Sequence, residues 1–433
     1  MQTLISGRGL SCDLPRGSSF PPLIPVRREF ESRAVADVAE ETRKAMLELN
    51  LEDRLRSGDR VLVAAGSRGI KDKAEILSGV CAYLRELDVT PTILGAMGSH
   101  GGGTAAGQRD VLESLGITEE RVGARIITSD EAVAIGEAED GQTVYCDPLV
   151  FEYDGFLAVN RIKPHTTARG AIQSGIIKML VVGMGHHRGA EAFHRSDPAR
   201  LSESLVSMWR VIRDKTPFMG GVGIVDDAQK RAAQVVGLKP AELEAREKEL
   251  LVTARELMPT LPFDRADVLV IEEMGKNYSG TGIDTNVIGR IRIEGTLSSD
   301  PPDIDKLVVL DLTDESHGNA CGLGLADFIT ARLARKVDLH STYLNVLTSR
   351  LTMRAMIPMI MGTDRDAVAA AIVTSGVPDL SRVRLALISN TLHLDSFLVS
   401  PALWDEIRRL PGLHADGEQT EMQFDDEGSM NPG

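Results

Sequence analysis

A lysine and several histidines gather near the middle of this chain of 433 residues. The segment from Arg161 to His194 holds four of the nine histidines, and Lys178 lies in it between two apolar residues, Ile177 and Met179. A buried ammonium group loses its hydration shell, so burial either lowers the pKa of a lysine or requires a compensating group. We therefore expect a compensating group beside Lys178.

Two of the histidines lie on predicted loops that follow apolar runs. His100 is in GAMGSHGGGTAAG, before a helix predicted to begin near Thr104, and His165 is in KPHTTARG. Glycines such as Gly101 and Gly102 let a backbone approach a ligand closely, and a helix N-terminus favours an anion such as a carboxylate or a phosphate. Surface exposure is the alternative for one histidine, but several at the ends of successive strands favour a common site.

Strands, glycine-containing turns and helices alternate along the first 275 residues, which is the order of a parallel α/β sheet. Helical spacing of apolar residues predicts helices over 31–50 and 72–88. Short apolar runs predict strands within 58–70, 89–103, 123–130, 153–165, 175–185, 220–227 and 266–275. Because ligands of such sheets lie beyond the carboxyl ends of the strands, we expect Arg68, His100, His165 and the segment Gly183–His194 to lie there.

The composition changes past residue 275. Residues 276–415 predict a second α/β unit, and the acidic residues 416–433 predict a flexible tail. We therefore predict an N-terminal cofactor-binding domain over 1–275 and a C-terminal domain over 276–415. The predicted fold class is α/β with two lobes, each a largely parallel sheet flanked by helices, and with the site in the cleft between the lobes.

The charge and the cysteines argue against several classes of function. The formal net charge of −15 repels phosphate backbones and no basic cluster offsets it, so we expect no nucleic-acid partner. The four cysteines form no CxxC pair, which argues against a zinc site or a disulfide framework. No apolar run reaches the ~20 residues of a membrane span, and the N-terminus lacks the apolar core of a signal peptide. We expect a cytoplasmic protein with no membrane partner.

A glycine pattern supports an alternative function. Gly183, Gly185 and Gly189 follow an apolar run, as in the turn of a dinucleotide-binding strand and helix. That motif also requires an acidic residue ~20 positions further on, at the end of the next strand, to bind the ribose. Here the next strand ends at Asp226 and Asp227, which lie too far along the chain. An oxidoreductase using NAD(P) is therefore a second hypothesis, and a non-catalytic small-molecule-binding protein is a third.

Longer strings of sequence carry a resemblance to a known family. GSRGI, GAMGSHGGGTAAGQRDVLESLGITEE, VNRIKPHTTARGAIQSGIIKMLVVGMGHHRGA and a later FH resemble the nickel-dependent lactate racemase family, and in particular a branch of it outside the lactate enzymes. The resemblance runs over most of the chain and is strongest between about residues 60 and 195. It implies a nickel-pincer nucleotide, pyridinium-3,5-bisthiocarboxylic acid mononucleotide with nickel, tethered to a lysine through a thioamide.

The resemblance also implies a role for individual residues. Lys178 matches the tethering lysine, His194 the nickel-binding histidine, His100 and His165 the acid/base pair, and Arg68 an arginine near the substrate. Gly101 and Gly102 are then expected to bind the cofactor. Acylation would remove the charge of Lys178.

The implied activity is that of a racemase or epimerase acting on C2 of a 2-hydroxy acid. The C2 hydrogen is too weakly acidic for a histidine to remove, so its transfer as hydride to an electrophilic ring is the easier route. Two histidines can move the hydroxyl proton on the two faces of the keto intermediate. The expected partners are the small-molecule substrate and the enzymes that make the cofactor, and the oligomeric state is left open.

Several positions depart from the lactate enzyme. The spacing from His165 to Lys178 is longer, and Gly289 or Ile291 and Arg292 stand where the family has a substrate-contacting glutamine and lysine. A 2-hydroxy acid other than lactate is therefore expected.

The roles of other polar residues near these segments have two possible interpretations. Arg161, Arg169, Arg292, Lys276 and Asn277 suit a larger or more polar acid, although a solvated or ion-paired role is the favoured interpretation. For His186, His187 and His317, surface or capping positions are favoured. As neighbours on a helix, His186 and His187 point in different directions, so at most one should face the site.

Overall fold

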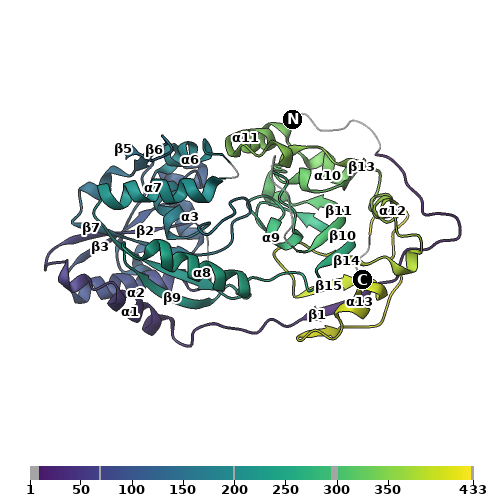
Figure 1. The fold of residues 1–433 in the computed structure, drawn as a ribbon, viewed down its shortest axis with the longest axis horizontal. Coiled ribbons are helices and arrows are strands. Elements are labelled where there is room, and N and C mark those ends of the chain that lie inside the picture. The colour runs from purple at the N-terminus through teal and green to yellow at the C-terminus, as the bar shows by residue number, and fades with distance from the viewer. Residues whose placement is uncertain (1–8, 68–69, 198–199, 294–300, 431–433) are drawn as a thin grey trace. The chain divides into compact units, whose positions relative to one another are not determined.

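A computed structural model describes residues 9–67, 70–197, 200–293 and 301–430 (Figure 1). The chain divides into two compact units. The continuous unit is Glu31–Met258, and the split unit is Met1–Phe30 together with Pro259–Gly433. Each unit has a largely parallel sheet flanked by helices, which confirms the predicted α/β fold class.

The sheet of the continuous unit has the strand order β4-β3-β2-β7-β8-β9 and is parallel except for β9. Its strands are β2 (Arg60–Ala65), β3 (Thr90–Gly95), β4 (Arg125–Ile127), β7 (Gly155–Arg161), β8 (Phe218–Asp226) and β9 (Ala232–Leu238). From β2 the chain moves outward to β3 and β4, and later returns to place β7 on the other side of β2. The strand order therefore reverses between β2 and β7, where open α/β sheets bind their ligands.

Helices and a small hairpin complete the continuous unit. They are α1 (Val38–Glu48), α2 (Lys73–Glu86), α3 (Ala105–Ser114), α4 (Glu119–Val122), α5 (Ile176–Lys178), the π-helical turn η4 (Met179–Gly183), α6 (His186–His194), α7 (Leu201–Lys215), α8 (Leu243–Leu257), β5 (Val133–Glu137) and β6 (Thr143–Cys146). Two apolar cores form in this unit. One holds α5, η4, α7 and α8, and the other holds α1 and α2.

The sheet of the split unit has the order β13-β12-β11-β10-β14-β15-β1-β16. Its first five strands are parallel, and β15, β1 and β16 continue it in antiparallel order. The elements are β1 (Ile24–Arg28), β10 (Arg265–Met274), α9 (Thr285–Ile288), β11 (Asp303–Leu312), β12 (Phe328–Thr330), α10 (Ala331–Lys336), α11 (Leu339–Ser349), β13 (Met359–Met361), α12 (Asp364–Thr374), β14 (Leu385–Ile388), β15 (Ser396–Val399), α13 (Pro401–Ile407) and β16 (Leu413–Ala415). Among the described parts of both units, no helix has the length and apolar character needed to cross a membrane.

The unit boundaries differ from the predicted domains 1–275, 276–415 and 416–433. β1 lies early in the chain but pairs with β15 and β16, so it belongs to the split unit. β10, assigned by the prediction to the first domain, lies at the centre of the other sheet because it pairs with β11 and β14. In the described part of the predicted tail, the Thr420 N–H donates to the Leu23 carbonyl (2.9 Å) and the Phe424 ring lies 5.0 Å from that of Phe20.

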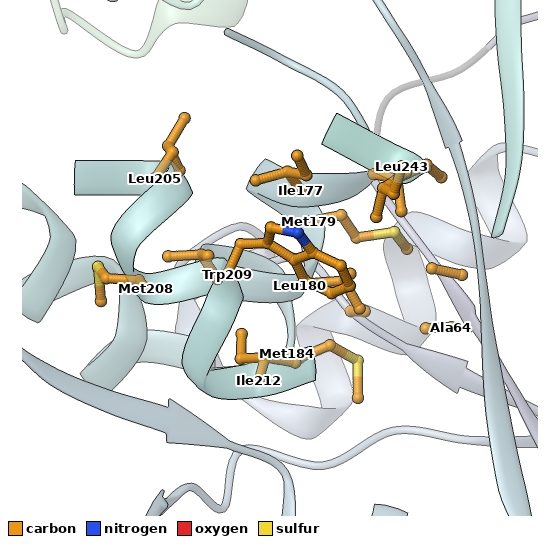
Figure 2. Packing of buried hydrophobic residues seen from close by; sticks show 14 of the residues in the cluster. Ala64, Ile177, Met179, Leu180, Met184, Leu205, Met208, Trp209, Ile212 and Leu243 are labelled. Carbon is orange, nitrogen blue, oxygen red and sulfur yellow. The ribbon is translucent and has the colours of Figure 1, made fainter. Parts of the chain in front are cut away.

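The strand predicted within 175–185 is helical, which corrects that prediction. A short run that is apolar on every side fits a buried strand and a buried helix equally well. Figure 2 shows Trp209 of α7 packed among Ile177, Leu180 and Met184 of this segment. Trp209 is 1% exposed, and its ring also meets Phe218 edge-on at 5.4 Å. The segment is therefore enclosed by apolar side chains.

We expect Trp209→Ala to lower the free energy of unfolding by about 3–5 kcal/mol, because a large buried ring leaves a cavity. Urea unfolding followed by circular dichroism measures this loss. Trp404→Ala is the matched control, since Trp404 is only half-buried and lies in α13 of the split unit. An equal or larger loss in the control would contradict the assignment of Trp209 as a core residue.

Candidate functional site

The loops after β2 and β7 flank the point where the strand order reverses. Asn160, near the end of β7, donates through Nδ2 to the Gly175 carbonyl (2.8 Å). Its Oδ1 lies so close to Gly66 that a methyl group at that glycine would come within 2.8 Å. Asn160 thus joins the two loops to the start of the segment that carries Lys178.

The Lys178 segment also packs against the loop that carries His100. The Gly98 N–H donates to the Gly183 carbonyl (3.3 Å), at the end of the π-helical turn. A methyl group at Gly183 would lie 2.7 Å from the Ala96 carbonyl oxygen, so only glycine fits this contact. Single π-turns inside helices are frequent at functional sites.

His165 and Lys178 meet directly. The His165 Nε2 atom lies 2.5 Å from the Lys178 Nζ atom, and Lys178 is half-buried. The Nδ1 atom of His165 accepts the backbone N–H groups of Thr167 (3.0 Å) and Ala168 (2.9 Å), so it carries no proton. The other ring nitrogen, Nε2, is therefore the one that faces Lys178 Nζ. The compensating group expected beside Lys178 is therefore the His165 ring.

The glycine loop of His100 follows β3. The His100 Nδ1 atom is hydrogen-bonded to the Ser67 hydroxyl, and the His100 ring is exposed. Gly101 and Gly102 both have left-handed backbone conformations, with φ of 67° and 69°, and the space around Gly102 is open. The helix predicted to begin near Thr104 is α3, whose first turn is capped by the Thr104 hydroxyl. Arg68, predicted near the substrate, lies outside the described residues.

His194 is the last residue of α6, half-buried, with its ring 5.4 Å from that of Phe193. Among the described residues there is no group of three or more His, Cys, Asp or Glu side chains that could hold a metal ion. The predicted nickel site needs only one protein ligand, because the tethered nucleotide would supply the other donor atoms. An imidazole is a suitable ligand for nickel.

His186 has a role that the sequence analysis missed. It was expected at a surface or capping position, but it is fully buried, whereas its neighbour His187 is exposed. His186 Nε2 lies 2.7 Å from the Asp147 carboxylate and Nδ1 lies 3.2 Å from Gln108 Nε2. Its backbone is left-handed (φ 49°), which a non-glycine residue adopts only where its surroundings hold it. Asp147 and Gln108 thus fix the turn between Lys178 and His194.

The favoured ion-paired interpretation is confirmed for two of the extra arginines. Arg161 binds Asp226 (2.8 Å) with both side chains largely buried, and Arg292 binds Asp327 (2.8 Å). Lys276 donates to the Asn345 side chain and the Gly280 carbonyl, both at 2.6 Å.

One further lysine lies behind the β2 loop. Lys73 donates to the Gly66 carbonyl and is 2% exposed. Burial, with a smaller contribution from the nearby charge of Arg161, lowers the pKa of Lys73 to about 7. The backbone of the β2 loop is therefore hydrogen-bonded to a buried amine whose pKa is about 7.

Comparison with known proteins gives a distant structural match. No family model and no curated protein matches the sequence of this chain. Among solved structures, the chain is similar to the lactate racemase apoprotein from Thermoanaerobacterium thermosaccharolyticum, with a TM-score of 0.48 and 11% sequence identity. The similarity covers 84% of this chain and 94% of that chain. The chemistry of the site follows from its own contacts.

The contact with the His165 ring predicts unusual reactivity of Lys178, because an imidazole N–H can donate only to an unprotonated amine. An ordinary lysine, with a pKa of ~10.4, is almost entirely protonated at pH 7. With limiting acetic anhydride at pH 7, we expect Lys178 to be acetylated at least ~10-fold faster than the exposed Lys215, measured by peptide mass spectrometry.

His165→Ala should reduce this advantage, because it removes the Nε2–H group beside the amine. His187→Ala is the matched control, an exposed histidine of the same region, and should leave the rate unchanged. Equal acetylation of Lys178 and Lys215 in the unaltered protein would show that Lys178 is an ordinary ammonium group.

Proposed function

We propose that this protein is a racemase or epimerase that inverts C2 of a 2-hydroxy acid by hydride transfer to and from a tethered nickel-pincer nucleotide. The observation that carries the proposal is the 2.5 Å contact between His165 Nε2 and Lys178 Nζ. It places an imidazole against a primary amine beside the point where the strand order reverses. A neutral amine is the form of lysine that can be acylated.

The residues present fit the proposed group. Lys178 would tether it, His194 would bind its nickel, and Gly101 and Gly102 would let the backbone lie close to it. The open space at Gly102 suits such an approach. When bound, the group supplies an electrophilic ring for hydride exchange with C2 of the substrate.

The two histidines then handle the hydroxyl proton. His165 Nδ1 already accepts two backbone N–H groups, so Nε2 is its only ring atom that can exchange a proton. His100 is bound through Nδ1 to Ser67, and its imidazole would take the same task on the other face. Two such groups, one for each face of a planar keto intermediate, allow inversion.

The oxidoreductase alternative loses its main support. A dinucleotide-binding glycine turn follows a strand, whereas the run before Gly183 is a helix that ends in a π-turn. A non-catalytic binding protein is the remaining alternative, and it predicts no covalent adduct on Lys178.

We expect the protein, made together with the enzymes that synthesise the cofactor, to carry nickel and a covalent adduct on the peptide that contains Lys178. Metal analysis and peptide mass spectrometry measure both. Lys178→Arg is the control, since it keeps a long side chain that ends in nitrogen but cannot form the thioamide, and it should lose the adduct. An unmodified Lys178 without nickel, in a preparation where a known nickel-pincer enzyme is loaded, would refute the proposal.

The histidine variants should separate proton transfer from metal binding. We expect His100→Ala and His165→Ala each to reduce racemisation of a 2-hydroxy acid substrate, measured per bound nickel, by about 10²–10⁴-fold. His194→Ala should instead lower the nickel content, because a coordination bond is lost. Racemisation assays and nickel analysis of the same preparations test this. Near-normal racemisation by both of the first two variants would refute the two-base assignment.

A further inference from the structure

A buried carboxyl group lies directly before Lys178. Glu247 of α8 is 1% exposed, and its Oε2 atom accepts the Ile177 N–H at 3.1 Å. Among the described residues, its Oε1 atom has no hydrogen-bond partner. This carboxyl group has no part in the proposed reaction, although it contacts Ile177, the residue next to Lys178.

The contact replaces a missing helix cap. α5 begins at Ile176, and the first N–H groups of a helix have no partner within the helix. The residue at the N-cap is Gly175, which has no side chain to accept them. Glu247 accepts instead, from a different helix. Because charge-assisted hydrogen bonds are stronger than neutral ones, an ionised carboxylate holds these groups most firmly.

The backbone of Gly175 lies close to the Glu247 carboxyl group. Its backbone is extended (φ −173°), a conformation open to any residue, so no conformational demand requires glycine there. A methyl group at Gly175 would lie 2.7 Å from Glu247 Oε2. The glycine therefore leaves room for the carboxyl group to reach the helix.

We propose that Glu247 is a positioning residue for Lys178. The Glu247 carboxylate holds the first turn of the helix that presents the Lys178 amine. The role of Lys178 as a tether rests on the proposed function, but the positioning of its amine does not. Deprotonation of Glu247 tightens this hold, and protonation weakens it.

The hold therefore changes with pH. Burial raises the pKa of Glu247 to about 7, against the opposing effect of the Ile177 and Ile176 N–H groups. The elements packed against α8 include α5, which carries Lys178, and β8, where Asp226 is bound by Arg161. The folded protein binds this proton more tightly than the unfolded chain, whose carboxyl has a pKa near 4.5. The proton bound by Glu247 thus stabilises the folded protein fully below pH 4.5, and this contribution to the free energy of unfolding is lost as the pH rises through about 7.

Glu247→Gln separates positioning from stability. Glutamine keeps one acceptor oxygen and cannot ionise, so the variant should be at least as stable as the unaltered protein at pH 8, by urea unfolding. Its Lys178 should nevertheless react more slowly. In acetylation, the amine nitrogen bonds to the acetyl carbon of acetic anhydride, acetate leaves, and the amine proton passes to water.

We expect the acetylation rate of Lys178 in the apoprotein to fall about fivefold in Glu247→Gln at pH 8.5. The ratio of the two rates should approach one at pH 6, where Glu247 is also neutral. Glu48→Gln is the matched control, because the exposed Glu48 also accepts a backbone N–H, from Gly237 (2.8 Å). The acetylation rate of Lys178 in Glu48→Gln, divided by that in the unaltered protein, should stay at one at both pH values. A ratio for Glu247→Gln that does not change with pH would overturn the proposal.

A second measurement needs no variant. Hydrogen exchange of the peptide over 175–184, corrected for the intrinsic pH dependence, should slow as the pH rises through about 7. Protection that is constant with pH would overturn the proposal even if Glu247→Gln did not fold. Because both experiments use the apoprotein, they can succeed when no nickel adduct forms, in which case only the proposed function fails.

Discussion

A primary amine can lie within a helix packed among apolar side chains only if another polar group bonds to it. The arrangement of the continuous unit follows from this constraint on Lys178. The matching group, His165, comes from the loop after β7. That loop can serve because two of its own backbone N–H groups fix the ring with Nε2 turned toward the amine. The imidazole therefore makes contacts in two directions, toward its own loop and toward the helix.

The helix itself is held at both ends by polar groups from distant parts of the chain. Asn160 and Glu247 bind its start, and the buried pair of Asp147 and His186 fixes the turn that follows it. Between them, apolar packing around Trp209 fills the remaining space. A buried polar group is costly unless it is bonded, so each of these contacts specifies one position of the segment more sharply than apolar packing alone can.

The sequence predicted much of the α/β framework, because β-branched runs and glycine turns have a local signature. It placed β2, β3, β7 and β8 correctly. It failed where tertiary packing decides: apart from Lys178 the run 175–185 is apolar, and it lies in the same apolar core as α7 and α8. Glu247 and Asp147 were missed because no local pattern marks a carboxyl group whose partner lies in another element. Lys178 was found because a charge within an apolar run is visible in one dimension.

The pairing of β1 with β15 and β16 has a consequence for how the protein is made. β1 precedes the whole continuous unit in the chain, whereas its two partner strands follow that unit. The continuous unit can fold in the meantime, whereas neither partner strand of β1 has yet been made. Open strand edges pair readily with other chains. Synthesis of this protein therefore contains a period in which β1 has no partner strand, and this period ends only when β15 and β16 emerge.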